Sequence, residues 1–151
     1  MIRKMLIPAF LLTLTVLPSC STGTHEYTKF LSIKGQTWDY KDTLSYEFGI
    51  KDTAEYRISL SVRYEKEYEF SNIWIKANDG NINSRIELPL FSLNGQPLGQ
   101  CSGGLCTQTL SWKDVQLNGS DTLRLHIVQN MRKNPLRGVS EVGVIIDRIP
   151  Q

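Results

Sequence analysis

Histidine is scarce in this sequence, which has only His25 and His126 among its 151 residues. No glycine-rich phosphate loop, nucleophile elbow or His-x-x-x-His pair accompanies them. The acidic residues occur singly or in pairs, apart from the stretch 65–69, which we interpret as a solvated turn or strand end. Because acid–base catalysis and metal binding depend on such residues, we expect no enzymatic activity, no metal site and no cofactor.

Long hydrophobic runs are also lacking. The main one, residues 5–17, has thirteen residues, fewer than the roughly twenty that cross a bilayer as a helix. It follows a basic start and precedes Pro18, Ser19 and Cys20, which is the layout of a secretory signal. The segment 17–20 resembles a lipobox, although Pro18 departs from the usual pattern. We predict a signal peptide over 1–19 and a lipid on Cys20, with an ordinary signal and an incidental cysteine as the alternative.

Charge of one sign is not in excess either. Removal of residues 1–19 takes away Arg3 and Lys4 but no acid, so the 17 basic residues become 15, equal to the 15 acidic ones. A balanced chain without a basic run does not favour nucleic-acid binding. We assign residues 20–26 to the lipidated cysteine and a short tether, and residues 27–151 to one domain.

Only two cysteines, Cys101 and Cys106, follow the lipidation candidate, and they enclose Gly103 and Gly104. Outside the cytoplasm two such residues favour a disulfide, with free thiols as the alternative. A redox site would require the spacing Cys-x-x-Cys and a zinc site four ligands.

Alternation with a period of two dominates the domain. In residues 56–64 every even-numbered residue is apolar or aromatic and every odd-numbered one is Arg or Ser, which predicts a half-buried strand. Weaker alternations occur at 73–75, 86–90, 123–127 and 142–146, and turn formers separate them at 79–80, 94–95 and 118–119. We predict an all-β sandwich, Ig-like or jelly-roll-like, with seven to eight antiparallel strands. Pro89 should lie in an edge strand or at a bulge.

The three tryptophans, Trp38, Trp74 and Trp112, have two interpretations. They can fill the space between two sheets, or they can form a platform on which a sugar ring stacks. His126 alternates with apolar neighbours, so we place it on the solvated face of its strand.

A resemblance to a known family emerges from the order of residues along the domain. The residues that carry it are Trp38, Phe48, Asp52-Thr53, Tyr56, Arg63, Tyr68, Ser71-Asn72-Ile73-Trp74, Leu98-Gly99, Met131-Arg132, Pro135-Leu136, Gly138 and Val142-Gly143. Together with the lipobox, this order resembles the gliding-motility lipoprotein family GldH of the Bacteroidota. The resemblance implies a non-enzymatic envelope lipoprotein associated with surface gliding and type IX secretion, and it supplies no catalytic residues. The Cys101/Cys106 pair is not part of the family pattern.

The segment from Met131 to Gly138 is our candidate partner surface. It brings basic residues together with two apolar ones that could contact a protein partner: Met131, Arg132, Lys133, Leu136 and Arg137. The alternative is a solvated loop before the last strand.

The phylum implied by the resemblance adds two expectations. No acidic cluster follows Cys20, and Ser21 stands next to it, so we expect a lipid-anchored protein on the periplasmic face of the outer membrane. Three Asp-Thr-aliphatic segments, centred on Thr43, Thr53 and Thr122, resemble O-glycosylation sites of exported proteins in this phylum. Equally, Asp-Thr pairs begin strands and turns by bonding the local backbone.

We therefore predict a membrane-anchored accessory or structural component of the gliding or secretion machinery, with envelope proteins as partners and no small-molecule ligand. A glycan-binding lipoprotein is the alternative function.

Overall fold

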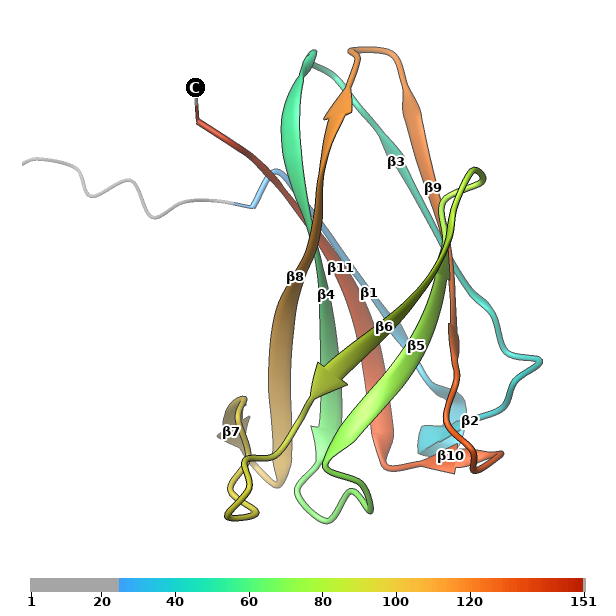
Figure 1. Ribbon diagram of the computed structural model, residues 1–151, viewed down its shortest axis with the longest axis vertical. Coiled ribbons are helices and arrows are strands. Elements are labelled where there is room, and N and C mark those ends of the chain that lie inside the picture. The colour runs from blue at the N-terminus through green and yellow to red at the C-terminus, as the bar shows by residue number, and fades with distance from the viewer. Residues whose placement is uncertain (1–24, 151) are drawn as a thin grey trace, which may run out of the picture.

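Residues 25–150 are described by a computed structural model, in which two antiparallel sheets pack face to face (Figure 1). Eight strands have six or more residues: β1 (Tyr27–Ser32), β3 (Leu44–Gly49), β4 (Ala54–Glu65), β5 (Asn72–Asn78), β6 (Asn83–Pro89), β8 (Leu105–Leu117), β9 (Thr122–Gln129) and β11 (Val139–Arg148). The shorter elements in this range are η1 (Lys34–Gln36), β2 (Thr37–Trp38), β7 (Gln100–Ser102) and β10 (Leu136–Arg137). The predicted all-β sandwich is confirmed.

The strand order is that of a jelly roll. The sheets read β1-β11-β4-β8-β7 and β3-β9-β5-β6, and β10 pairs with β2 beside them. Four antiparallel pairs nest inside one another along the chain: β1 with β11, β3 with β9, β4 with β8, and β5 with β6. This nesting decides between the two predicted topologies in favour of the double-sheet jelly roll.

The alternating segment 56–64 forms the middle of β4, as predicted. Its even-numbered side chains Tyr56, Ile58, Leu60, Val62 and Tyr64 are completely buried between the sheets. On the other face, Ser59 and Ser61 are buried too, which the sequence did not indicate. The reason is that β4 lies in the interior of its sheet, between β11 and β8.

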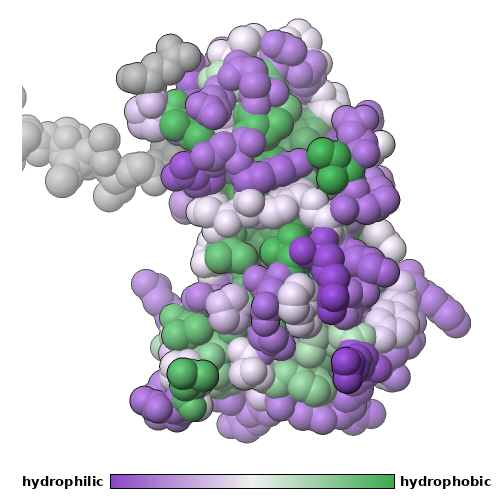
Figure 2. All heavy atoms as spheres, viewed as in Figure 1, coloured by the Kyte–Doolittle hydropathy of each residue, from purple (hydrophilic) through white to green (hydrophobic). Residues whose placement is uncertain are grey.

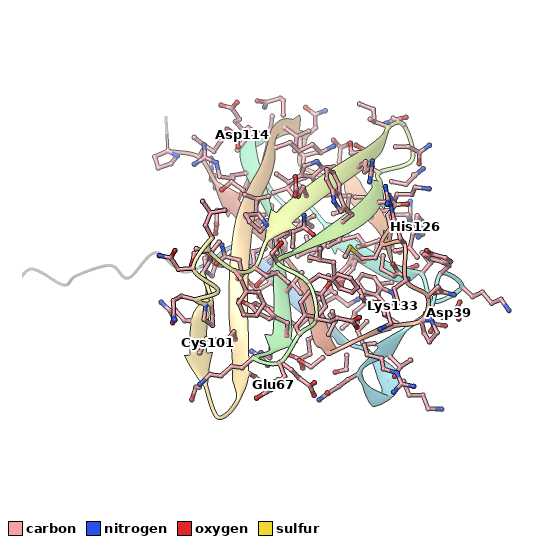
Figure 3. All side chains as sticks on the ribbon, turned by 60° about the horizontal axis from the view of Figure 1, so that its bottom comes forward. Asp39, Glu67, Cys101, Asp114, His126 and Lys133 are labelled. Carbon is pink, nitrogen blue, oxygen red and sulfur yellow. A yellow bond between two sulfur atoms is a disulfide. The ribbon has the colours of Figure 1, made fainter. Side chains whose placement is uncertain are left out.

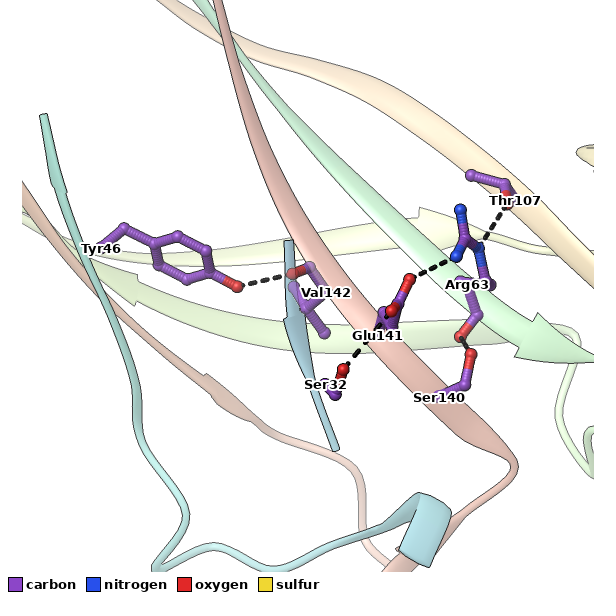
Figure 4. Close-up of polar contacts among 7 residues, drawn as sticks. All are labelled: Ser32, Tyr46, Arg63, Thr107, Ser140, Glu141 and Val142. Carbon is purple, nitrogen blue, oxygen red and sulfur yellow. Dashed lines mark hydrogen bonds and ion pairs between the residues drawn. The ribbon is translucent and has the colours of Figure 1, made fainter. Parts of the chain in front are cut away.

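Polar contacts tie the strands together on and across this sheet (Figure 4). Arg63 on β4 pairs with Glu141 on β11 at 2.5 Å and donates to Thr107 Oγ1 on β8 at 3.3 Å. Ser32 on β1 donates to the same Glu141. From the opposite sheet, the Tyr46 hydroxyl donates to the backbone oxygen of Val142 at 2.8 Å, so one buried tyrosine links both layers.

Some elements differ from the sequence predictions. The longest strand, β8, shows no clean alternation of buried and exposed residues. The reason is that its pairing with β4 shifts in register between Ile58 and Ser59. Residues 118–119 are predicted turn formers that tolerate a positive φ, but in the structure the residue with the positive φ is Ser120, at 87°. Gly119 is required for another reason, since a Cβ there would lie 2.7 Å from the Lys51 backbone oxygen. Pro89 ends β6, an edge strand, as predicted.

An ion pair closes the sandwich at the β5–β6 turn. The register shift in β8 places Lys113 opposite Ile58, whose side chain points into the core. Lys113 Nζ donates to Asp79 in the turn of the other sheet, and the Asp79 side chain is only 11% exposed. Burial alone would raise the pKa of Asp79, but the Lys113 hydrogen bond, the backbone N–H groups of Ile82 and Asn81 and the Lys113 charge lower it to about 2.

This ion pair predicts a loss of stability in acid. The folded-state pKa of Asp79 lies below its ordinary value of 3.8, so its contribution is complete above pH 4 and disappears as the pH falls toward 2. Asp79→Asn should therefore lower the free energy of unfolding by about 1–2 kcal/mol near neutral pH and by much less near pH 2. Urea unfolding of both proteins across this range measures the difference.

Asp114→Asn is the matched control, because Asp114 pairs with Arg57 on the exposed face of the sheet. A solvated pair contributes little. An Asp79→Asn effect that is independent of pH would contradict the prediction.

Candidate functional site

The candidate site lies on the outer face of the four-stranded sheet, where β5 begins. Alternation along β5 turns Ile73 and Ile75 into the core, both completely buried, and Asn72 and Trp74 outward. On the neighbouring strand β6, Arg85 lies on the same outer face, because it pairs with Lys76. The Arg85 guanidinium carbon lies 4.1 Å from the centre of the Trp74 ring, as a cation–π pair.

The loop 130–135, which follows β9, is fixed against the same strand. Asn130 N donates to Trp74 O at 2.7 Å, and Trp74 N donates to the Met131 sulfur at 3.1 Å. Beneath the loop, the buried Gln129 accepts a hydrogen bond from Met131 N at 2.8 Å and donates from Nε2 to Asn134 Oδ1 at 3.1 Å. The backbone of this loop is thus held by a buried amide, and Arg132 projects from a fixed position.

A second loop, 66–71, completes the site. Glu69 in this loop pairs with Lys133, and the Tyr40 hydroxyl donates to the Met131 backbone oxygen from the other side. In Figure 3, Lys133 and Asp39 lie on one side of this end of the sandwich, and Cys101 lies on the other. We call this end, formed by loop 66–71, loop 130–135, β2 and β10, the distal end.

The two loops, together with β5 and β6, line a hollow of about 300 Å³. Its walls combine aromatic, amide and basic side chains: Phe70, Asn72, Trp74, Arg85, Asn130, Met131 and Arg132. Figure 2 shows this face of the molecule, over which β5 and β6 run, as a mixture of hydrophilic and hydrophobic side chains. The hollow therefore suits a small polar or charged group better than a large apolar one.

The residues of the predicted partner segment differ in their exposure to solvent. Arg132, Lys133 and Arg137 are exposed, whereas Met131 is 8% exposed and Leu136 completely buried. The expectation that Met131 and Leu136 offer apolar contacts to a partner therefore needs correction. Met131 packs beneath the loop, and Leu136 pairs with Trp38 through the β10–β2 ladder.

Trp74 and Arg85 are the pair that sequence reasoning missed. The sequence gives Trp74 two interpretations, core packing or a sugar platform, and carries no signal that singles out Arg85. The alternation of buried and exposed residues along β5 and β6 predicts that both side chains lie on the outer face of the sheet. Their contact depends on the pairing register of β5 with β6, which lines up Trp74 with Glu87 and Lys76 with Arg85.

Cys101 and Cys106 form a disulfide across the β7–β8 ladder, with Cα atoms 4.0 Å apart. Cys106 is completely buried against the core, and Cys101 is exposed. The bond holds the edge strand β7 to the sheet and lies away from the hollow.

The other predicted residues are spread over the surface. Thr43, Thr53 and Thr122 are all exposed, and Thr53 Oγ1 accepts a hydrogen bond from Gly119 N at 2.9 Å. Each threonine stands within one residue of the start of β3, β4 or β9. Cys20 and the signal peptide lie outside the described residues.

The two histidines lie far apart: His25 precedes β1, and His126 lies on β9. His25 Nδ1 is 2.6 Å from Asp147 Oδ1 beside β11, and His126 Nδ1 is 3.0 Å from Ser45 Oγ on the outer face of the other sheet. In efficient serine nucleophiles, a third group usually orients the histidine that acts as the base. Within residues 25–150, no acid contacts His126 at hydrogen-bond distance, and no group of three or more His, Cys, Asp or Glu could hold a metal ion.

The model of the family described as GldH lipoprotein matches residues 25–146, which is nearly the whole jelly roll. The chain belongs to the GldH lipoprotein family. This membership confirms the resemblance drawn from the sequence and makes the chain a lipoprotein of the gliding-motility group. The GldH family is not known as an enzyme family. No curated protein sequence matches this chain.

One solved structure of low sequence identity shares the fold. A family GH115 4-O-methyl-alpha-glucuronidase with specificity for decorated arabinogalactans aligns with 84% of this GldH chain at a TM-score of 0.50 and 12% identity. The chain covers only 18% of that enzyme. Eiger TNF from S. frugiperda aligns with 70% of the chain at a TM-score of 0.28 and 13% identity, and the chain covers 65% of it. The first likeness shows the fold alone.

No helix within residues 25–150 has the length and hydropathy of a membrane span.

The buried amide beneath the site predicts the effect of one substitution. Gln129→Met keeps the volume of the side chain but removes its hydrogen bonds to the loop 130–135 and leaves Met131 N without its acceptor. We expect a loss of about 1–3 kcal/mol in the free energy of unfolding and faster amide exchange across the loop. Gln116→Met, at an exposed position on β8, is the control and should change neither quantity.

The Cys101–Cys106 disulfide should contribute to the stability of the fold. Reduction of the Cys101–Cys106 bond should lower the free energy of unfolding by about 2 kcal/mol, as expected for so short a closed loop. Urea unfolding with and without a phosphine reductant measures it, and the Cys101→Ser/Cys106→Ser variant should be insensitive to the reductant. An unchanged midpoint for the native sequence would contradict this prediction.

Proposed function

We propose that this GldH-family protein is a non-enzymatic lipoprotein, attached through Cys20 to the periplasmic face of the outer membrane. There it serves as an accessory or structural component of the machinery for gliding motility and type IX secretion. The family match over residues 25–146 is the observation that carries the proposal.

The distance from the proposed lipid to the domain supports this function. Only residues 21–26 separate Cys20 from the first strand, which begins at Tyr27. Six extended residues span at most about 20 Å. A lipid on Cys20 would hold the jelly roll next to the bilayer, where its faces can meet other membrane-attached proteins.

The arrangement of polar residues supports a binding role over catalysis. Perturbed acids and histidines that converge in one cleft are the usual sign of an active site. Here His25 contacts Asp147 on β11, His126 contacts Ser45 on the other sheet, and the strongly perturbed acid Asp79 is bound to Lys113 at a turn. The hollow beside Trp74 is instead lined by cationic, amide and aromatic side chains.

Glycan binding, the alternative function, receives less support. A sugar platform requires an open aromatic face. Trp38 is completely buried and donates from Nε1 to Asp42 O at 2.7 Å. Arg85 lies over Trp74, and Lys113 Nζ lies 4.5 Å from the centre of the Trp112 ring.

The lipid attachment can be tested in the native host. Cys20→Ala removes the thiol that would carry the lipid, so we expect the protein to leave the outer-membrane fraction while its domain still folds. Two or more acyl chains bind a bilayer far more firmly than one or none. Fractionation of envelopes, followed by immunoblotting and a gliding or secretion assay, measures the effect.

Ser21→Ala is the matched control, because it changes the neighbouring residue and keeps Cys20. It should remain in the outer-membrane fraction. If Cys20→Ala remained in the outer-membrane fraction, the proposed attachment through Cys20 would be wrong. If protease released the domain from intact cells, the proposed periplasmic location would be wrong.

A further inference from the structure

We propose that the hollow between Trp74, Arg85 and Arg132 is a docking site for a carboxylate side chain of a protein partner. The occupant we infer is an Asp or Glu in an exposed peptide segment that also carries an apolar residue. This inference deepens the proposed function, since it rests on a protein partner in the envelope.

Unpaired positive charge is the first observation. Residues 25–150 contain seven arginines. Four of them form ion pairs with carboxylates: Arg57 with Asp114, Arg63 with Glu141, Arg124 with Glu47, and Arg148 with Asp52. Of the three without a carboxylate within 4.0 Å in the described part of the chain, two, Arg85 and Arg132, line the same hollow. The fold thus places two guanidinium groups that have no ion-pair partner within 4.0 Å at one hollow of its surface.

The Arg85 guanidinium is preorganised. Its central carbon lies 4.1 Å from the centre of the Trp74 ring, so contact with the indole limits the rotamers of Arg85. Stacking uses the face of a guanidinium and leaves the N–H groups on its edge available. Two parallel N–H groups match the two oxygens of a carboxylate, which gives a bidentate contact.

Arg132 faces the same hollow from a fixed backbone. Hydrogen bonds from Met131 N to Gln129 and from Asn130 N to Trp74 O hold the residues that precede it. Asn72 in the wall donates to Glu87, so its amide is already engaged. A carboxylate entering between Arg85 and Arg132 would therefore meet two cations without displacing an internal ion pair.

Apolar surface adjoins the hollow and favours a peptide over a free anion. Phe70 lines both this hollow and a second one of about 430 Å³, whose walls also include Phe91 and Leu93. Leu93 is fully exposed. A segment with an acidic and an apolar residue could place the first between the arginines and the second against Phe70 and Leu93.

The position of the hollow favours a protein over the lipid surface. β11 pairs Val139 with Tyr64 at the distal end and Arg148 with Tyr56 at the other. The chain enters at Tyr27, which pairs with Ile146 near that other end. Tyr27, where β1 begins, and the distal end therefore lie toward opposite ends of the sandwich (Figure 1). A lipid on Cys20 would lie nearer the entry end.

Peptide binding to the lipidated protein tests the site. The mature protein, uniformly labelled with ¹⁵N, is placed in phosphatidylcholine nanodiscs. It is titrated with an acetylated, amidated peptide containing a central Leu-Glu pair, and separately with the Leu-Gln counterpart. We expect the Leu-Glu peptide to shift the indole N–H signal of Trp74 and to bind about tenfold or more tightly than the Leu-Gln peptide.

Charge-removing variants locate the contact. Arg85→Gln and Arg132→Gln should each weaken binding of the Leu-Glu peptide about tenfold, and Arg85→Lys should weaken it too, because lysine keeps the charge without the planar fork. Arg124→Gln removes the same charge from the same sheet face at a residue already paired with Glu47, so it should bind as the unchanged protein does.

Three outcomes would overturn the inference: equal binding of the two peptides, equal loss in Arg124→Gln, or no shift of the Trp74 signal. A Trp74 shift caused by vesicles containing phosphatidylglycerol, but not by the Leu-Glu peptide, would assign the site to a lipid headgroup instead. Failure of the Cys20→Ala fractionation test would count against the proposed anchor and not against the docking site, because the shift of the Trp74 signal reports on the hollow however the protein is attached to the bilayer.

Discussion

The inner face of β4 is the surface on which both layers of this GldH-family protein depend. Five alternate side chains from Tyr56 to Tyr64 are completely buried there. Burial of each such side chain contributes about 1.5–3 kcal/mol, so this one strand supplies a large share of the interaction between the sheets. β11 and β8 pair with its two edges, and β9 and β5 lie in the sheet that packs against it.

Closure at the ends of the sandwich relies on polar contacts instead. At the β5–β6 turn, Lys113 and Asp79 join the two sheets, and at the distal end Gln129 holds the loop 130–135 from beneath. Both are partly or fully buried polar groups whose partners are supplied by a different strand or loop. Such groups stabilise one arrangement of the loops because an unpaired alternative would leave them unsatisfied. The shape of the hollow beside Trp74 depends on the contacts between Gln129 and the loop 130–135, because residues of this loop form part of its wall.

Several parts of the fold followed from the sequence because they depend on residues close in the chain. The alternation in β4, the edge position of Pro89 and the all-β class all derive from the period-two pattern and from proline chemistry. β8 was missed because a register shift breaks its alternation. Burial of Met131 and Leu136 was missed because their partners, Trp74 and Trp38, are distant in the sequence. The GldH resemblance follows from the sequence because it depends on residue order alone.

The sequence by itself determined the chemistry available to this protein: two histidines, a lipobox-like segment before Cys20, a balanced charge and alternating strands. Only the tertiary structure decided which of these residues meet. It pairs four arginines with carboxylates and brings Arg85, which lies over Trp74, and Arg132, in the fixed loop, together in one hollow. The physical reason is that strand register and loop anchoring bring these residues together. Both depend on contacts between residues far apart in the chain, and local patterns do not encode those contacts.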